Sequence, residues 1–277
     1  MPHPVMPALT VHPQVLSLLA GLVEDRAGLH YGLDDRALLA EKVVPRALDR
    51  GFGSLLDYYY FLRYDPAGDA ELDRLVEALC VHESYFFREV QPLRVAVEEV
   101  LAPAIRAGRR PRVWCAAAAQ GEEPLTLAML LDERGWLGQV ELEATDVSLR
   151  ALERARAGVF GQRALRALPA GVLGRWLEPQ GQGAVARREL VEAVRWRRLN
   201  LMDAAAVRAM GPVELLLCRN VIIYFADETV RRLVRSLGEA LAPGGALVVG
   251  ASESLLRFGS ALACEERGGV FLYRAAR

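Results

Sequence analysis

Apolar residues in the first part of the chain recur at three- and four-residue intervals, the spacing of one helix face. The clearest run, between residues 16 and 23, stops at Gly28, which breaks the pattern. Asp34-Asp35 can cap a second helix, which Pro45 should kink or shift at its start, and residues 55–62 and 72–79 predict two more. No strand signal precedes residue 111. We therefore predict that residues 1–90 form a helical domain with a linker.

From residue 111 the pattern changes to short apolar runs that alternate with helical segments. This alternation is typical of a parallel α/β sheet with helices on its faces. The predicted strands are 112–116, 140–146, 215–217, 246–250 and a final edge strand at 270–273; the predicted helices are 122–131, 149–157 and 228–241. Residues 165–198 are irregular apart from a turn at 179–183, which indicates a small β-hairpin insertion. Residues 91–277 are thus predicted to be one α/β domain that carries this subdomain.

The segment 215–225 is a continuous apolar run that is interrupted once, by Cys218-Arg219-Asn220. A run of this kind predicts a strand buried on both faces. The polar residues then lie at the carboxyl edge of the sheet, where open α/β folds bind their ligands. A buried arginine and asparagine need partners there, because unpaired polar groups are costly to bury. This edge is the predicted binding site.

The loop after the first predicted strand, Ala116-Ala-Ala-Ala-Gln-Gly-Glu-Glu-Pro124, contains a single glycine. A dinucleotide fingerprint requires G-x-G-x-x-G, so a nicotinamide or flavin dinucleotide is disfavoured, while close approach of a ligand without a pyrophosphate remains possible. Glu122 could hold an amine-bearing ligand, whereas Glu123 is better explained as a charge at a helix N-terminus. Asp146 is placed either to bind a ribose diol or to cap the next helix.

Residues 241–249 read L-A-P-G-G-A-L-V-V, a turn and strand frequent in Rossmann-like methyltransferases. With the degenerate first loop and the acidic second strand, this turn favours a class I methyltransferase domain that uses S-adenosylmethionine (SAM). Four further segments resemble the CheR family of chemotaxis receptor methyltransferases: Val81-His-Glu-Ser-Tyr-Phe-Phe-Arg-Glu89, Gln120-Gly-Glu-Glu-Pro124, Ala144-Thr-Asp146 and Cys218-Arg-Asn-Val-Ile-Ile-Tyr-Phe225. Arg198-Leu-Asn-Leu201 is a weaker fifth. They follow the family's order, and the helical first domain and the hairpin insertion resemble its architecture.

The resemblance implies a role for each matching residue. Arg88 and Tyr224 are the candidate catalytic residues nearest the transferred methyl group. Cofactor contacts are implied for His82, Ser84, Arg88, Glu122, Asp146, Asn200, Leu201, Asn220 and Val221. The family usually has asparagine in place of His82 and threonine in place of Ser84, and Ala117–Gln120 replace much of its first loop.

Simpler structural explanations accompany several of these residues. Phe86 and Phe87 are expected to pack, and Cys218 fits a small buried residue. Arg88 alone could be a surface ion pair, and Tyr224 alone could belong to a core.

The implied reaction is methylation of glutamate side chains in the cytoplasmic helices of chemoreceptors, which yields glutamate methyl esters and S-adenosylhomocysteine. A glutamate with a pKa of about 4.3 is already ionised at neutral pH, so the reaction needs no general base. Lys42, Arg46 and Arg50 lie on one helix face that could dock an acidic receptor helix or simply face solvent. The alternatives are a SAM-binding regulatory module without turnover and a related methyltransferase with another substrate.

Bulk properties add a few limits. The net charge of −1 over 277 residues gives no reason to expect nucleic acid as a partner. The four cysteines have no C-x-x-C spacing, and nothing indicates a metal site or a disulfide framework. No apolar run reaches the length of a membrane span, and Met1-Pro2-His3-Pro4 lacks the features of a signal peptide. A cytoplasmic monomer without membrane insertion is expected.

Overall fold

A computed structural model describes residues 9–276, so the prediction made on the segment 1–4 lies outside the described residues. The chain forms two compact units. The described residues up to Val81, together with Tyr224–Ala226, make the first unit, and residues from His82 to Ile223 and from Asp227 onward make the second. Within residues 9–276, no helix combines the length and the apolarity needed to cross a bilayer.

The helical unit contains four α-helices: α1 Pro13–Ala27, α2 Arg36–Asp49, α3 Leu55–Tyr64 and α4 Gly68–Leu79. Gly28 ends α1 in the left-handed region with φ of 76°, as the pattern predicted. Asp35 stands at the N-cap position of α2, although its side chain makes no capping bond, and α2 starts well before Pro45 and continues through it. Ser54 caps α3 by accepting hydrogen bonds from two backbone N–H groups. The core of this unit consists of buried side chains from all four helices, among them Leu19, Val23, Leu39, Tyr58 and Leu75.

A short segment from later in the chain belongs to this unit. Phe225 forms an isolated antiparallel bridge with Leu29, and the His30 N–H donates to the carbonyl of Tyr224 over 2.8 Å. The apolar run at 215–225 is therefore divided between the two units. Its first part forms the strand β7 (Val213–Cys218) of the α/β unit, whereas Tyr224 and Phe225 belong to the helical unit.

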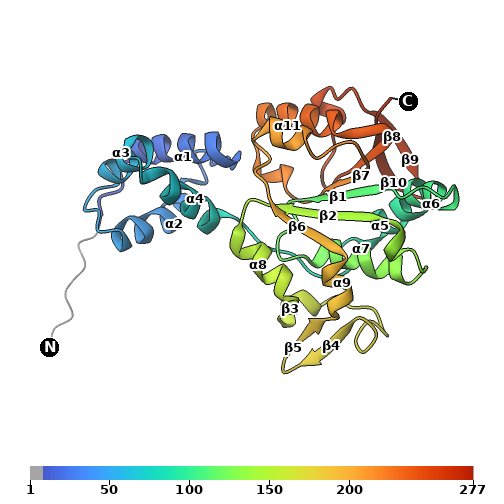
Figure 1. The fold of residues 1–277 in the computed structure, drawn as a ribbon. Coiled ribbons are helices and arrows are strands. Elements are labelled where there is room, and N and C mark those ends of the chain that lie inside the picture. Colours follow the sequence, from blue (N-terminus) through green and yellow to red (C-terminus); the bar gives the residue numbers. More distant parts are fainter. Residues whose placement is uncertain (1–8, 277) are drawn as a thin grey trace. The chain divides into compact units, whose positions relative to one another are not determined.

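The second unit is built on a seven-stranded sheet of order β6-β2-β1-β7-β8-β10-β9 (Figure 1). The strands are β1 Arg112–Ala116, β2 Glu141–Asp146, β6 Val194–Arg198, β7 Val213–Cys218, β8 Leu241–Val248, β9 Ala263–Arg267 and β10 Val270–Arg274. The five neighbouring strands β6, β2, β1, β7 and β8 are parallel to one another. Strand β10 runs antiparallel to both of its neighbours, β8 and β9. The predicted edge strand at 270–273 lies instead between β8 and β9. We did not predict β9, because its residues are largely exposed and give no apolar signal.

Helices cover both faces of this sheet, with α11 on one side and α5 and α7 on the other (Figure 1). Their bounds are α5 Val90–Ala96, α6 Ala102–Arg106, α7 Glu122–Asp132, α8 Leu149–Ala157, α9 Arg188–Glu192, α10 Ala204–Arg208 and α11 Asp227–Glu239, and a π-helical turn at Val97–Leu101 joins α5 to α6. Single 3-10 turns lie at Leu137–Gln139, Gln162–Leu165, Ile222–Tyr224 and Leu256–Phe258. The α/β architecture agrees with the prediction from the alternating pattern.

The insertion forms a separate three-stranded antiparallel sheet of order β3-β5-β4, from Val159–Phe160, Gly183–Ala186 and Leu177–Gln180. The turn at 179–183 joins β4 to β5, as predicted. Gly183 is required there, because an added Cβ would lie 2.2 Å from the Phe160 carbonyl oxygen. The predicted range of 165–198 extended too far, since Val194–Arg198 pair with β2 in the main sheet. A half-exposed edge strand such as β6 lacks the continuous apolar run that marked the central strands.

Candidate functional site at the carboxyl edge of the sheet

Unusual backbone conformations gather where the central strands end. All five described non-glycine residues with positive φ lie in three neighbouring segments: Phe87 and Glu89 before α5, Ala117 and Ala119 after β1, and Asn220 after β7. A left-handed non-glycine residue costs roughly 1–2 kcal/mol, so surrounding contacts must hold each in place. Such strain is typical of binding sites.

The segment 82–89 is anchored to the core of the α/β unit. Phe86 is fully buried, and its ring meets that of Phe160 edge-on with centroids 4.7 Å apart. The Phe87 N–H donates to Thr126 Oγ1 over 3.1 Å. The expected packing of both phenylalanines is confirmed. Because of these anchors, the segment, which the sequence prediction took as the linker, groups with the α/β unit.

Glu122 is a buried carboxylate at the start of α7, with 2% of its surface exposed. The Ser84 hydroxyl donates to it, while Oε2 has no hydrogen-bond partner among the described residues. Burial raises the pKa of Glu122 to about 7, against the smaller lowering effect of hydrogen bonds, and the Glu83 and Arg166 charges oppose each other. A buried, incompletely satisfied carboxylate of this kind is suited to a cationic ligand group.

Asp146 lies at the end of β2 and shapes the loop beside it. Its Oδ2 accepts the Ala119 N–H and its Oδ1 accepts the Ser148 N–H, each over 2.9 Å. Burial raises the pKa of Asp146, and these N–H groups and the nearby His82 lower it in part. Ser148 rather than Asp146 caps α8, by accepting the Ala151 N–H. A carboxylate has about four acceptor positions, so Asp146 retains capacity for hydroxyl donors of a ligand.

His82 presents a second incompletely satisfied group. Its Nε2 is buried and has no hydrogen-bond partner among the residues that the structure describes. An imidazole nitrogen can donate or accept according to its tautomer. Nε2 of His82 is therefore available to hydrogen-bond a ligand group.

Gly121 has a packing role that sequence reasoning did not identify. The possible close approach of a ligand to this loop stays a prediction. An added Cβ would lie 2.8 Å from the Trp196 ring and 2.9 Å from the Ala155 Cβ. Together with its φ of 96°, this shows that Gly121 is needed for packing of the loop against β6 and α8.

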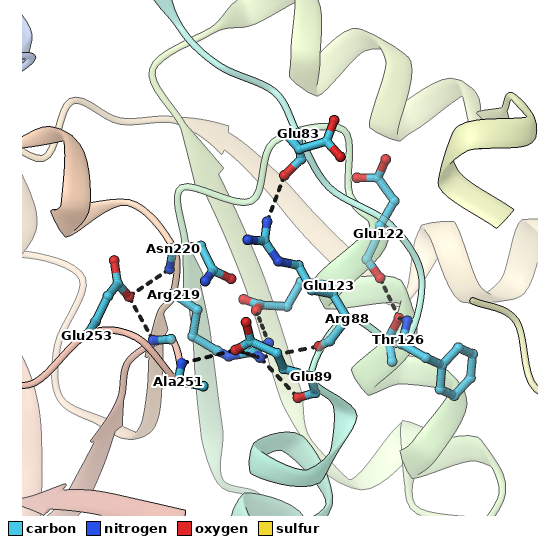
Figure 2. A network of polar contacts seen from close by, with 12 residues as sticks. Glu83, Arg88, Glu89, Glu122, Glu123, Thr126, Arg219, Asn220, Ala251 and Glu253 are labelled. Carbon is cyan, nitrogen blue, oxygen red and sulfur yellow. Dashed lines mark hydrogen bonds and ion pairs between the residues drawn. The ribbon is translucent and has the colours of Figure 1, made fainter. Parts of the chain in front are cut away.

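Arg219, which the sequence left without a partner, is the centre of a buried polar network (Figure 2). Its Nη1 lies 2.7 Å from Glu123 Oε2 and its Nη2 lies 3.2 Å from Glu89 Oε2. Nη2 also donates to the carbonyls of Arg88 and Glu89, over 3.2 and 3.0 Å. Glu123 is thus more than a helix-end charge, since it pairs with the buried arginine.

Glu253 completes the network on the side of β8. One of its oxygens accepts the N–H groups of Asn220 and Gly250, each over 2.7 Å. The Asn220 side chain bonds the Glu89 carboxylate. Sequence reasoning missed both Glu89 and Glu253. An acidic residue at or shortly after the end of a predicted strand, the signal used for Asp146, was also present at Glu253.

The other predicted residues occupy simpler environments. Arg88 is half-buried, and its Nη1 donates to the Glu83 carbonyl over 2.8 Å. Asn200 accepts the Met202 N–H through its side chain over 3.0 Å, in the turn after β6 that also holds Leu201. Val221 is half-buried next to Asn220. The shared catalytic role of Arg88 and Tyr224 stays a prediction, because Arg88 belongs to the α/β unit and Tyr224 groups with the helical unit.

The basic face predicted on α2 is partly used within its own unit. Arg46 Nε lies 2.8 Å from the buried carboxylate of Glu71, and Arg50 Nε lies 3.5 Å from it. Lys42 is exposed. Docking of an acidic helix on this face stays a prediction. Of its three basic residues, Lys42 is the one that does not pair with Glu71.

A mostly parallel α/β sheet, an acidic residue after each of its first two strands and a first loop without the dinucleotide fingerprint define a class I methyltransferase fold. Residues 82–266 match the family model described as CheR methyltransferase, SAM binding domain, and residues 14–80 match CheR methyltransferase, all-alpha domain. The chain therefore belongs to the CheR methyltransferase family, and it is a SAM-dependent methyltransferase.

Individual relatives agree with this assignment. "Chemotaxis protein methyltransferase 2" of Vibrio cholerae is 33% identical over 85% of this chain and 83% of its own length. "Chemotaxis protein methyltransferase 1" of Pseudomonas aeruginosa is 33% identical over 84% of this chain and 87% of its own. A third relative, the "Probable biofilm formation methyltransferase WspC" of Pseudomonas aeruginosa, is 30% identical over 85% of this chain and 56% of its own.

The residues at the carboxyl edge fit SAM chemically. The cofactor carries an ammonium group and a ribose diol, which suit the unsatisfied Glu122 carboxylate and the spare acceptor positions of Asp146. The unpartnered Nε2 of His82 supplies one further polar contact. Within residues 9–276, His, Cys, Asp and Glu side chains form no group of three placed to hold a metal ion.

Proposed function

We propose that the protein methylates glutamate side-chain carboxylates in the cytoplasmic helices of chemoreceptors. The observation that carries the proposal is the family match over both units, together with relatives named chemotaxis protein methyltransferases. Methyl transfer gives a glutamate methyl ester and S-adenosylhomocysteine, and it takes place in the cytoplasm.

In this proposal the residues at the carboxyl edge of the sheet bind the cofactor and orient it. Glu122 holds the ammonium group of the cofactor with help from Ser84, and Asp146 receives the ribose hydroxyls. His82, Asn200, Leu201, Asn220 and Val221 supply the remaining contacts. When bound, SAM supplies a methyl group on a sulfonium, which is the electrophile.

The acceptor requires no activation by the enzyme. A receptor glutamate with a pKa of about 4.3 is ionised at neutral pH, so proton transfer is not part of the step. Arg88 and Tyr224 orient the acceptor by hydrogen bonds, which places the carboxylate in line with the methyl group and keeps water away. An Arg88 contact that held the carboxylate equally in ground and transition states would not raise kcat.

The test is labelling with tritiated SAM of membranes that contain the receptors of the native host. Base-labile methyl esters that map to receptor glutamates support the proposal. SAM binding without transfer would favour a regulatory module, and transfer to another acceptor would favour a related methyltransferase. The similarity to the biofilm-associated relative makes receptors of other signalling systems a specific second acceptor class.

Variants of the candidate catalytic residues sharpen this test. We expect Arg88→Ala to lower kcat about 100-fold, because misplacement of a reacting group by about 1 Å has an effect of this size. Its melting temperature should stay near that of the wild type. Arg195→Ala, an exposed arginine on β6, is the matched control. Wild-type rates and SAM affinities for both Arg88→Ala and Tyr224→Phe would refute the assigned roles.

A further inference from the structure

Arg219 makes more contacts than a buried cation needs for charge balance. Its side chain is 1% exposed, and its guanidinium meets two carboxylates and two backbone carbonyls. Buried ion pairs are weak sources of stability, because desolvation offsets much of the attraction. The contacts to backbone carbonyls point to a role in fixing a conformation.

The groups that Arg219 holds come from two separate segments, and Arg219 itself lies in a third. The carbonyls belong to Arg88 and Glu89, at a left-handed turn where Glu89 has φ of 43°. The Glu123 carboxylate comes from the first turn of α7, next to Glu122. Arg219 itself precedes Asn220, which has φ of 57°. One guanidinium therefore fixes the linker, the start of α7 and the end of β7 relative to one another, as Figure 2 shows.

The charges around the network reinforce this arrangement. Burial acts to raise the pKa of Glu89, but the Ala251 N–H and the Arg219 charge outweigh it, and the pKa of Glu89 is lowered. Glu89 therefore stays ionised. Its Oε2, which pairs with Arg219, also accepts the N–H of Ala251 after β8 over 3.0 Å. Glu122, by contrast, points away from this network (Figure 2). The network holds the backbone of the site, while Glu122 is left for a ligand.

We infer that Arg219 is a positioning residue for methyl transfer, which sets Arg88 and Asn220 in their working places while touching neither cofactor nor acceptor. The inference rests on the proposed function for the nature of the transfer. A lysine could keep the charge but could not span these acceptors, because its ammonium lacks the planar fork of the guanidinium.

The test uses the full chain with Arg219→Lys, and Arg112→Lys as a matched control. Arg112 also donates to two backbone carbonyls, those of Pro212 and Met210, each over 3.0 Å, and it lies near a carboxylate, Glu141. It stands at the start of β1, so it makes contacts of the same kind at the other edge of the sheet, with its side chain 37% exposed. SAM affinity is measured by titration calorimetry without acceptor, and thermal melts are recorded for each variant.

We expect Arg219→Lys to weaken SAM binding by about tenfold or more, the effect of losing one charge-assisted hydrogen bond. Its kcat should also fall, while Arg112→Lys changes neither quantity. Equal SAM affinity and kcat for Arg219→Lys and the wild type would overturn the inference. So would a loss in Arg219→Lys no greater than that in Arg112→Lys.

If Arg219→Lys does not fold, Glu123→Gln decides the question, because it keeps the side-chain shape and removes the charge of one partner. Weaker SAM binding at a wild-type melting temperature supports the inference, and unchanged binding overturns it. Because SAM affinity is read without acceptor, the result stands even if receptor labelling fails. The two failures are therefore distinguishable.

Discussion

Within residues 9–276, each unit of the protein contains a buried charge cluster, and these two clusters have opposite polarity. In the helical unit, the carboxylate of Glu71 is 1% exposed and lies within 4 Å of Arg46, Arg50 and Arg74. Tyr58 donates to the same carboxylate over 3.1 Å. In the α/β unit, a buried arginine is surrounded by carboxylates.

The backbone around the two clusters separates their roles. The Glu71 cluster is built from α2, α3 and α4 together with Arg50, the residue after α2, and none of its members has a positive φ. The Arg219 cluster is flanked by left-handed residues such as Glu89 and Asn220. Regular helices need no further explanation than packing, whereas several strained residues beside one charge indicate that a particular geometry is being held. Burial of charge alone does not identify a site.

The largest expected effect tests whether the Glu71 cluster is purely structural. Glu71→Gln should lower the free energy of unfolding by about 3 kcal/mol, because it leaves three arginines without their buried partner. SAM affinity should not change. Urea denaturation and calorimetry check the two parts, with the exposed Glu41→Gln as control. Weaker SAM binding in Glu71→Gln would remove the distinction between the clusters.

A second, smaller effect concerns pH. The pKa of Glu122 is raised to about 7, so the carboxylate is increasingly protonated as the pH falls below that value. The ionised form is needed to hold an ammonium group. SAM affinity should therefore weaken about tenfold between pH 8 and pH 6. Glu122→Gln should bind weakly at every pH, and a slope equal to that of the wild type would show that a group other than Glu122 is responsible for the pH dependence.

The same group affects stability without ligand in a defined direction. The folded pKa of about 7 is above the ordinary value of 4.5, so protonation favours the folded state. The contribution is fully present below pH 4.5 and is lost as the pH rises through 7. Thermal melts of wild type and Glu122→Gln should therefore diverge between these values, with the variant the more stable at high pH.

The smallest expected effect concerns the α2 face. Lys42→Ala should raise the KM for receptor by about threefold, as exposed charges affect docking modestly. The effect should shrink at high salt, and SAM affinity should not change. Arg63→Ala, another exposed residue of the helical unit, is the control. Methylation kinetics at two salt concentrations measure this, and an effect equal to that of the control would exclude docking through Lys42.

Much of the fold could be predicted, because its signals are local. The helix at 122–131 and the strands at 112–116 and 140–146 follow from apolar periodicity, and their observed bounds differ by a residue or less. The strand β9 and the placement of β6 could not be predicted in this way. Both are edge strands with mostly exposed residues, so they lack the apolar run that marks a central strand, and β6 also pairs with β2, which is distant in sequence.

The position of a candidate residue was predictable where it lies at the end of a recognisable strand or in a motif. Asp146 ends a predicted strand, Asn220 follows one, and Glu122 opens a predicted helix. The sequence could not show which carboxylate of the pair Glu122 and Glu123 would be paired. That depends on Arg219, which is 96 residues from Glu123 in the chain and contacts it only after the sheet forms.

The sequence by itself determined the two-part organisation, the parallel sheet and the edge at which polar residues gather. These features depend on the order of apolar and polar residues along short segments. The tertiary structure alone decided that Arg219 is the centre of the network and that Gly121 is there for packing. It also left Glu122 and His82 with unsatisfied atoms, because hydrogen-bond partners are set by distances between segments that folding brings together.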